Sequence, residues 1–322
     1  MNISKAEAYK CLGDHVANIW KVLYEKRWEK ALGYSATCQA MALEMSLGNQ
    51  LYAIAKLVHM SIFVNGTLVN TETWPHFTTE RVEAFERIEQ NFFRKILKAH
   101  SKTPIEAIYL ELGVLPLRFH IMKKRILYLH DIMNREDGEL TKQVVTQQKI
   151  SCYEGDFYPQ VCQDMVSLSI SEQDLKCTKE QLKALVCAKI KARSYEYLIS
   201  KAKQHSKVKE EIYGNAEGAA YYMDNRFTPD LVTLLFKFRT RTYLVKNNFR
   251  NNYRNTNINC PLCGVHDDKQ EHIFECHNIL LEYSKHMRCR ADDIYSNDVD
   301  VLYDVAVTLK ELVSIRERLI TN

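Results

Sequence analysis

Apolar side chains recur every three or four residues along this chain, and that spacing constrains its fold more than any other feature. The clearest run is Val82, Phe85, Ile88, Phe92, Phe93 and Ile96, which would form one face of a helix. A β-sandwich needs many tight turns, which glycine and proline supply, yet the 322 residues include only 10 glycines and 6 prolines. The sequence therefore predicts a mainly α fold.

Helix boundaries can be read from turn and capping residues. The strings Thr103–Glu106 and Thr178–Gln181 have the pattern of capping boxes, in which a threonine and a side chain three residues later cap the helix start. Gly113 would end the first of these helices in a left-handed conformation. Further helices are expected from Pro116 to about Arg135, from the second box to about Ile212, and from Pro229 to about Leu244.

Two breaks divide the predicted helices. A looser region rich in serine, with Gly155 and Pro159, follows Glu136–Gly138 and reaches Lys176, and glycines recur at Gly214–Gly218. We expect bundle-like helical regions at 1–138 and 139–250, followed by a small metal-binding region and a C-terminal helix at 251–322.

The sequence predicts no association with membranes. Met1–Lys10 has no apolar signal core. The longest apolar stretch, Leu51–Val64, is interrupted by Lys56 and His59 and is shorter than the roughly 20 residues that span a bilayer. We expect a nuclear or cytoplasmic location, where cysteines remain reduced thiols. Glycine-rich nucleotide loops of the G-x-x-x-x-G-K and G-x-G-x-x-G types do not occur in the sequence.

One cluster has the spacing of metal ligands. Cys260, Cys263, His272 and Cys276 follow the pattern C-x2-C-x8-H-x3-C. Two cysteines two residues apart can present both sulfurs to one ion, and a histidine and a cysteine four apart share one face of a helical turn. Three thiolates and one imidazole leave no open position for water, so the pattern predicts one structural Zn²⁺. His277 is an alternative fourth ligand, and His266 a weaker one.

A basic and aromatic stretch leads directly into this cluster. No acidic residue occurs between Lys237 and Arg254. Basic side chains neutralise phosphates, and aromatic rings stack on unpaired bases. The candidate nucleic-acid contacts are Lys237, Arg239, Arg241, Lys246, Phe249, Arg250, Tyr253 and Arg254, whereas Phe236 and Leu244 are expected to point into the core. Further basic runs occupy Lys189–Lys209 and positions 118–125.

Several strings resemble the region downstream of the polymerase palm in non-LTR retrotransposon reverse transcriptases. They are Ala107–Arg118 (AIYLELGVLPLR), Arg125–His130 (RILYLH), Phe236–Arg241 (FKFRTR), and the segments CPLCG and EHIFEC that hold the four metal-ligand candidates. The resemblance covers roughly Thr79 to Cys276. It implies a thumb-like region at 1–138, a helical linker at 139–250 and a CCHC zinc knuckle at 251–322.

The catalytic part of that family is not found in this sequence. Its polymerase needs carboxylates that hold two metal ions, typically in an Ala-Asp-Asp hairpin between apolar strands. Ala291-Asp292-Asp293 follows the knuckle and is preceded by basic residues rather than by an apolar strand. We therefore expect no polymerase or nuclease chemistry of the chain's own.

The leading hypothesis is a zinc-stabilised nucleic-acid-binding fragment or domesticated derivative of a retrotransposon reverse transcriptase. Its partners would be RNA or DNA, and the polymerase core of a longer retroelement protein. The alternative is a zinc-stabilised helical module that binds proteins, with the basic runs merely solvated. A nuclease that uses the C-terminal acids is a third and weaker hypothesis.

Overall fold

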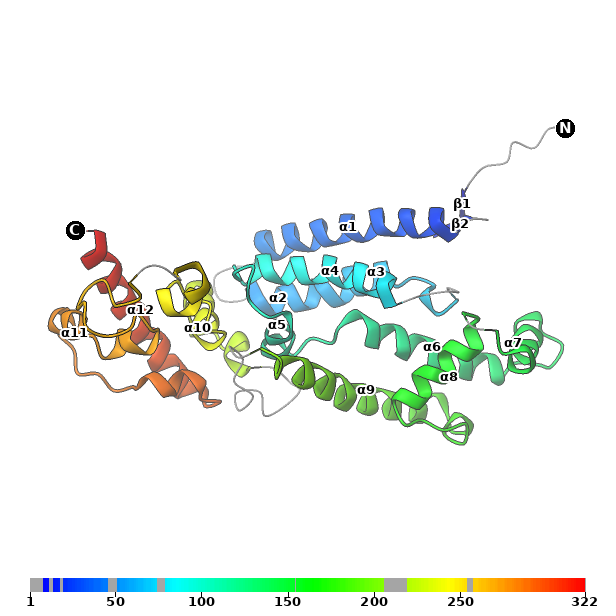
Figure 1. Cartoon of the computed structure of the whole chain (residues 1–322). Helices are drawn as coiled ribbons and strands as arrows, with labels where there is room; N and C mark the ends of the chain where they lie inside the picture. Colours follow the sequence, from blue (N-terminus) through cyan, green and yellow to red (C-terminus); the bar gives the residue numbers. More distant parts are fainter. Residues whose placement is uncertain are drawn as a thin grey trace. The chain divides into compact units, whose positions relative to one another are not determined.

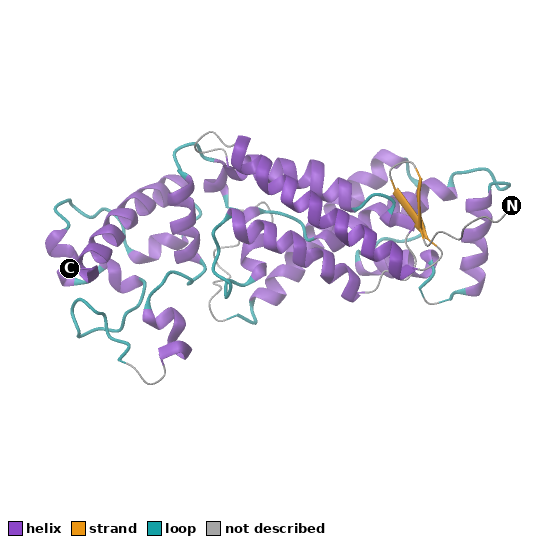
Figure 2. Cartoon of the chain, turned by 90° about the horizontal axis from the view of Figure 1, so that it is seen from above, coloured by secondary structure: helices purple, strands orange, loops and turns teal. Residues whose placement is uncertain are grey.

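The computed structural model describes residues 8–11, 14–17, 20–45, 51–73, 79–153, 155–205, 219–253 and 257–321. These residues are mainly helical, which confirms the predicted fold class (Figures 1 and 2). The α-helices are α1 (Trp20–Met45), α2 (Leu51–Val58), α3 (Asn65–Thr67), α4 (Thr79–Ile96), α5 (Ile105–Leu112), α6 (Leu117–Met133), α7 (Leu140–Ser151), α8 (Phe157–Ser167), α9 (Lys179–Ala202), α10 (Pro229–Arg239), α11 (His277–Glu282) and α12 (Val299–Thr321).

Shorter elements connect these helices. A π-helix, η2 (His59–Val64), continues α2, and 3₁₀ turns occur at η3 (Thr71–Thr73), η4 (Asp174–Lys176), η6 (Ala220–Met223), η7 (Lys246–Tyr253), η8 (Glu271–Phe274) and η9 (Ala291–Tyr295). Strands β1 (Ala8–Cys11) and β2 (Asp14–Ala17) pair antiparallel, with Ala8 opposite Ala17. None of the described helices is long and apolar enough to cross a membrane.

Most predicted helix starts are found, with one change of mechanism. Thr178 and Gln181 exchange hydrogen bonds between side chain and backbone, as a capping box requires. Gly113 ends α5 with φ 61°. At the other predicted box, however, Pro104 occupies the N-cap and the Thr103 hydroxyl donates to Thr242 Oγ1 instead. That capping-box prediction is wrong, because a tertiary partner takes the hydroxyl.

Two predicted helix ends lie too far along the chain. α9 ends at Ala202, and residues 206–212 of the predicted extension lie outside the described residues. α10 ends at Arg239 rather than near Leu244. Arg241 has φ 51°, a left-handed backbone conformation that stops a helix.

The region 139–176, expected to be loose, contains α7 and α8. These helices were missed because several of their apolar side chains, among them Leu140, Ile150 and Val166, are exposed and blur the periodic pattern. The opposite faces of the two helices contribute Val145, Val161 and Met165 to a buried core.

The described contacts divide the chain into two compact units. Unit 1 comprises Met1–Ala42, Ala55–Phe92 and Leu115–Tyr197, and unit 2 comprises Leu43–Ile54, Phe93–Val114 and Leu198–Asn322. Four of the five divisions fall inside helices, namely α1, α2, α4 and α9. The units therefore differ from the three consecutive regions expected from the sequence, because loops and glycines do not mark those divisions.

The core of unit 1 lies among α6, α7, α8 and α9, the green helices of Figure 1. Phe119, Ile126 and Leu129 from α6 meet Leu182 and Val186 from α9. Closer to α4, the buried His59 ring stacks between Phe63 and Phe92 and bonds Glu89 through Nε2 at 2.8 Å.

The core of unit 2 surrounds a buried ion pair. Glu111 on α5 accepts from Arg239 Nε and from the Tyr221 hydroxyl, both at 2.8 Å. Arg239 Nη1 also donates to the carbonyls of Ile294 and Ser296. This network joins α5, η6, α10 and η9. The apolar faces of α10 and α12 pack around it.

Candidate metal centre

Backbone hydrogen bonds fold the segment 257–276, which we call the knuckle segment, into a compact turn. The Cys260 N–H donates to the His266 carbonyl at 2.7 Å, and the Gly264 N–H donates to the Cys260 carbonyl at 2.9 Å. Gly264 has φ 69°, a conformation that glycine adopts without strain. His272 lies on η8, and Cys276 precedes α11. Short local turns thus bring the two halves of the motif together.

The four predicted ligands meet as the spacing requires. Their ligand atoms all lie within 4.8 Å of one another. Cys263 Sγ is 3.3 Å from His272 Nε2, and Cys260 Sγ is 3.9 Å from Cys276 Sγ. Zn–S bonds of about 2.3 Å in a tetrahedron place two sulfurs about 3.8 Å apart. The grouping of Cys260, Cys263, His272 and Cys276 is therefore confirmed, and these residues could bind one metal ion.

The two sides of the site differ in how readily their thiols ionise. Hydrogen bonds from the His266 and Val265 backbone, with a smaller contribution from His272, lower the pKa of Cys263 to about 6. Burial raises the pKa of Cys276 to about 11, and the neighbouring Cys260 sulfur adds to that effect. A bound cation removes this penalty because a coordinating thiol is deprotonated.

The alternative ligands do not join the cluster. His277 is the first residue of α11 and is exposed, and His266 is exposed on the loop. The His266 and His272 ring centroids are 5.2 Å apart. Cys276 therefore groups with Cys260, Cys263 and His272. His266 contacts the cluster through its backbone carbonyl and through its ring beside His272, and it does not belong to the group of four.

Two side chains that sequence reasoning missed attach the knuckle segment to its surroundings. The buried carboxylate of Asp268 accepts from Arg316 Nη2 on α12 at 2.9 Å and from the Lys246 N–H at 2.8 Å. The Gln270 amide donates to the Phe238 carbonyl at 2.8 Å. In the sequence, the one signal for Asp268 and Gln270 is that they lie between the candidate ligands Cys263 and His272. Polar residues of such a loop are ordinarily solvated, so the sequence did not predict their burial.

The structure corrects the expectation that Arg239 contacts a phosphate. Its side chain is fully buried and paired with Glu111. Arginine at a helix C-terminus is usually solvated, but here the guanidinium satisfies a buried carboxylate and two carbonyls. A charge in such a site is held by its partners and has no surface to offer a ligand.

The other predicted contacts are placed in different environments. Arg241 is partly buried and pairs with Glu271 at 3.0 Å. Lys246 Nζ donates to the carbonyls of Asn257 and Asn259, so it fastens the start of the knuckle segment. Lys237 is half-buried.

The predicted aromatic contacts are only partly described. Phe249 is buried, with its ring 4.8 Å from the His100 ring, which corrects its expected role in stacking on bases. The side chains of Arg250 and Tyr253, and all of Arg254, lie outside the described residues. Phe236 is buried as expected, whereas Leu244 is 70% exposed and that prediction is wrong, because α10 ends before it.

A groove of about 410 Å³ lies in unit 2. Lys98 and Lys237 line it together with Tyr243, the exposed Leu244, and Arg316 and Ile320 of α12. Lys98 meets Asp230 at 3.5 Å through an exposed pair, which contributes little to stability. We call this the lysine groove.

A second basic surface follows the knuckle segment. Lys285, His286, Arg288 and Arg290 are exposed on the stretch after α11. Asp293, in the Ala-Asp-Asp string, accepts from the Arg290 N–H at 2.7 Å and so caps η9. In the sequence, these cations form the basic run that directly precedes Ala291-Asp292-Asp293.

Comparisons with known proteins found no matching protein family, no matching curated protein and no matching solved structure.

Proposed function

We propose that this chain is a zinc-stabilised nucleic-acid-binding module, without polymerase or nuclease chemistry of its own. The observation that carries the proposal is the Cys₃His cluster, whose spacing suits one tetrahedral ion and leaves no ligand position for water. Zn²⁺ is favoured because it combines thiolate and imidazole ligands in structural sites of this kind. The ion would stabilise the segment that Lys246 and Asp268 attach to the rest of unit 2.

The lysine groove supports nucleic acid as the partner. Lys98 and Lys237 supply charge at its edge, and the exposed Leu244 and Ile320 supply apolar surface for bases. Arg288 and Arg290 add exposed charge beside the metal site in the sequence. Together with the resemblance to retrotransposon reverse transcriptases, this arrangement favours a module that holds RNA or DNA for a polymerase core.

Salt-dependent binding tests the proposal. Fluorescence anisotropy of the zinc-loaded chain with a short single-stranded RNA should show affinity that falls as salt rises, because phosphate contacts release counterions. The double change Lys98→Gln and Lys237→Gln should make the log–log salt slope shallower by about 1.4, at about 0.7 per contact on single strands. Lys183→Gln, an exposed lysine of α9, is the matched control. A wild-type slope in the double variant would remove the lysine groove from the proposal.

Exposed apolar side chains favour the second candidate, a protein-interaction module. Leu140, Ile150, Tyr153 and Val166 are each more than two-thirds exposed, on α7, α8 and the loop between them. Surface of this kind is typical of protein contacts. The absence of measurable affinity for RNA or DNA at low salt would favour this function instead. Affinity for nucleic acid that does not change with salt concentration would also favour it.

A further inference from the structure

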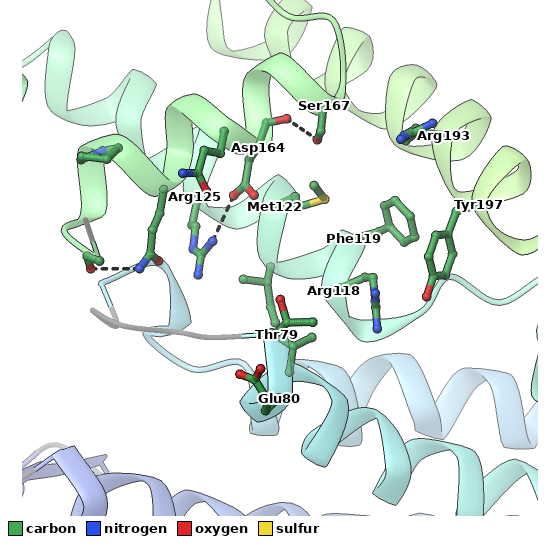
Figure 3. Close-up of a pocket in the computed structure, with 16 residues that line it drawn as sticks. Thr79, Glu80, Arg118, Phe119, Met122, Arg125, Asp164, Ser167, Arg193 and Tyr197 are labelled. Carbon is green, nitrogen blue, oxygen red and sulfur yellow. Dashed lines mark hydrogen bonds and ion pairs between the residues drawn. The ribbon is translucent and has the colours of Figure 1, made fainter. Parts of the chain in front are cut away.

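A cleft in unit 1 gathers three arginines around aromatic and apolar side chains. Its volume is about 800 Å³, within the range of small-molecule sites. Residues of α4, α6, α8 and α9 line it, and Figure 3 shows how they face the cavity. We call it the arginine cleft. It lies outside the unit that holds the metal centre.

Each of the three arginines pairs with a carboxylate, and the pairs of Arg118 and Arg125 are the less exposed ones. Arg118 donates through Nε and Nη2 to the two oxygens of Glu86, at 2.8 and 2.5 Å, and its side chain is still 24% exposed. Arg125 Nη1 donates to Asp164 Oδ2 at 3.2 Å. The Glu86 pair raises the already high pKa of Arg118, which stays charged. A guanidinium has five N–H donors, so a bidentate pair leaves donors for a further anion.

The side of the cleft with Arg118 and Arg193 also carries the aromatic rings. Figure 3 shows Phe119, Tyr197, Arg118 and Arg193 on the same side, away from the Arg125–Asp164 pair. The Arg118 guanidinium lies 5.0 Å from the centre of the Tyr197 ring. The rings of Phe119 and Tyr197 pack edge to face at 5.9 Å. Arg193 lies at the edge, where its Nη1 donates to Glu196 Oε2 at 3.3 Å. Both of these side chains are more than half exposed, and such a pair is weak.

Acidic groups limit where an anion can lie. Asp164 is occupied by Arg125, and Glu80 lies at the start of α4 on the other side of the cavity from Arg193 (Figure 3). An anion is therefore disfavoured near Glu80. Beside Arg118 and Arg193 it would use the guanidinium N–H donors that Glu86 and the exposed Glu196 leave available. One helical turn before Asp164 on α8, Gln160 contributes a buried Oε1 with no donor among the described residues, while its Nε2 donates to the Gly155 carbonyl at 2.9 Å.

We infer that the arginine cleft binds a nucleotide, with the phosphate at Arg118 and Arg193 and the base against Phe119 and Met122. Arginine pairs well with phosphate oxygens. A ring edge and a thioether form an apolar wall for a flat base. The unpaired Gln160 oxygen suits an amino group such as that of adenine. The nucleotide can come from solution or from a bound strand, and the inference does not depend on zinc or on the lysine groove.

Calorimetric titration of the full chain with AMP tests the inference. AMP should bind more tightly than adenosine, which lacks the phosphate for the arginines. It should also bind more tightly than inorganic phosphate, which lacks the base for the apolar wall. Arg193→Glu should weaken AMP at least about tenfold through the lost charge-assisted contact. Ser167→Trp, which places an indole in the cleft, should abolish binding. Lys183→Glu on the same helix is the matched control, and thermal melting checks that each variant folds.

Competition identifies the source of the nucleotide. If Ser167→Trp also weakens single-stranded RNA, the cleft takes a nucleotide of a strand. If RNA affinity is unchanged while AMP binding is lost, the cleft takes the free nucleotide. The double change Lys98→Gln and Lys237→Gln should leave AMP affinity as in wild type. Absence of AMP binding to the wild-type chain would overturn the inference, as would equal AMP affinity in wild type, Arg193→Glu and Ser167→Trp.

Discussion

At the scale of single residues, the charge of a basic side chain did not determine whether it faces solvent or lies in the core. Lys237 and Arg239 are two residues apart on α10, yet Lys237 lines a groove and Arg239 is buried against Glu111. The residues of a helix face different directions, and only the surrounding elements decide which direction is solvent. The prediction for Cys260, Cys263 and Cys276 was correct, because the spacing of these residues along the chain limits how far apart their sulfurs can lie.

The ligand assignment predicts a selective loss of metal. Cys263→Ser should lose the bound zinc, because a closed four-ligand site depends on each thiolate. Elemental analysis of the purified variant gives the zinc content, and hydrogen exchange should show loosening of the knuckle segment while the core of α6–α9 stays protected. Cys152→Ser, an exposed cysteine of unit 1, should retain full zinc. Stoichiometric zinc in Cys263→Ser would refute the assignment.

The buried ion pair predicts a large stability effect from one side chain. Arg239→Met should destabilise the chain by about 3–5 kcal/mol, because it leaves the Glu111 carboxylate buried without its cation. Adding Glu111→Leu should recover part of the loss. Glu311→Gln breaks an exposed pair with Lys285 and should cost no more than about 1 kcal/mol. Urea unfolding measures all three, and equal small losses would contradict the proposed burial penalty.

At the scale of elements, helix ends depended on both local and distant partners. Gly113 and the Thr178–Gln181 box act through their own backbone, so the sequence predicted them correctly. The predictions for Thr103 and Leu244 were wrong for different reasons. The Thr103 hydroxyl bonds Thr242, which is far along the chain, and Leu244 is exposed because α10 ends before it. Local rules therefore hold where no tertiary partner competes.

Two glycine substitutions should have opposite effects. Gly113→Ala should destabilise the chain by about 1 kcal/mol, because φ is 61° at the end of α5 and a Cβ is strained there. Gly33→Ala lies within α1, where an added Cβ meets nothing within 4 Å, and should stabilise by about 0.5–1 kcal/mol. Thermal and urea unfolding would compare the two variants. Stabilisation by Gly113→Ala would contradict the left-handed cap.

At the scale of the whole molecule, the contacts form units that the linear order of the chain does not reveal. Segments 43–54 and 93–114 belong with the C-terminal unit, although loops and glycines suggested consecutive regions. Each unit has its own polar feature. Unit 2 has the candidate metal centre, and unit 1 has a buried group formed by His59, Glu89 and His120. The second of these predicts how stability responds to pH.

Acid should destabilise the fold through His120. Burial lowers the pKa of His120 from 6.5 to about 4. The neighbouring Glu89 carboxylate opposes this shift, whereas His59 and Lys123 add to it. The unfolded chain therefore takes up the proton first, so stability falls as pH drops from about 6.5 to about 4, by up to about 3 kcal/mol. His120→Gln should flatten the pH dependence relative to wild type in that window. Parallel wild-type and variant curves of unfolding free energy against pH would contradict this assignment.

The sequence alone determined the mainly helical class, several helix boundaries and the grouping of the four candidate metal ligands. Helical periodicity, left-handed glycine and ligand spacing are local properties, and they act over a few residues whatever surrounds them. Tertiary structure alone decided that Arg239 and Phe249 are buried, that α7 and α8 form, and that Asp268 holds the knuckle segment. It also created the arginine cleft from four separate helices. Burial and cavities depend on which distant segments pack together, and no short stretch of sequence contains that information.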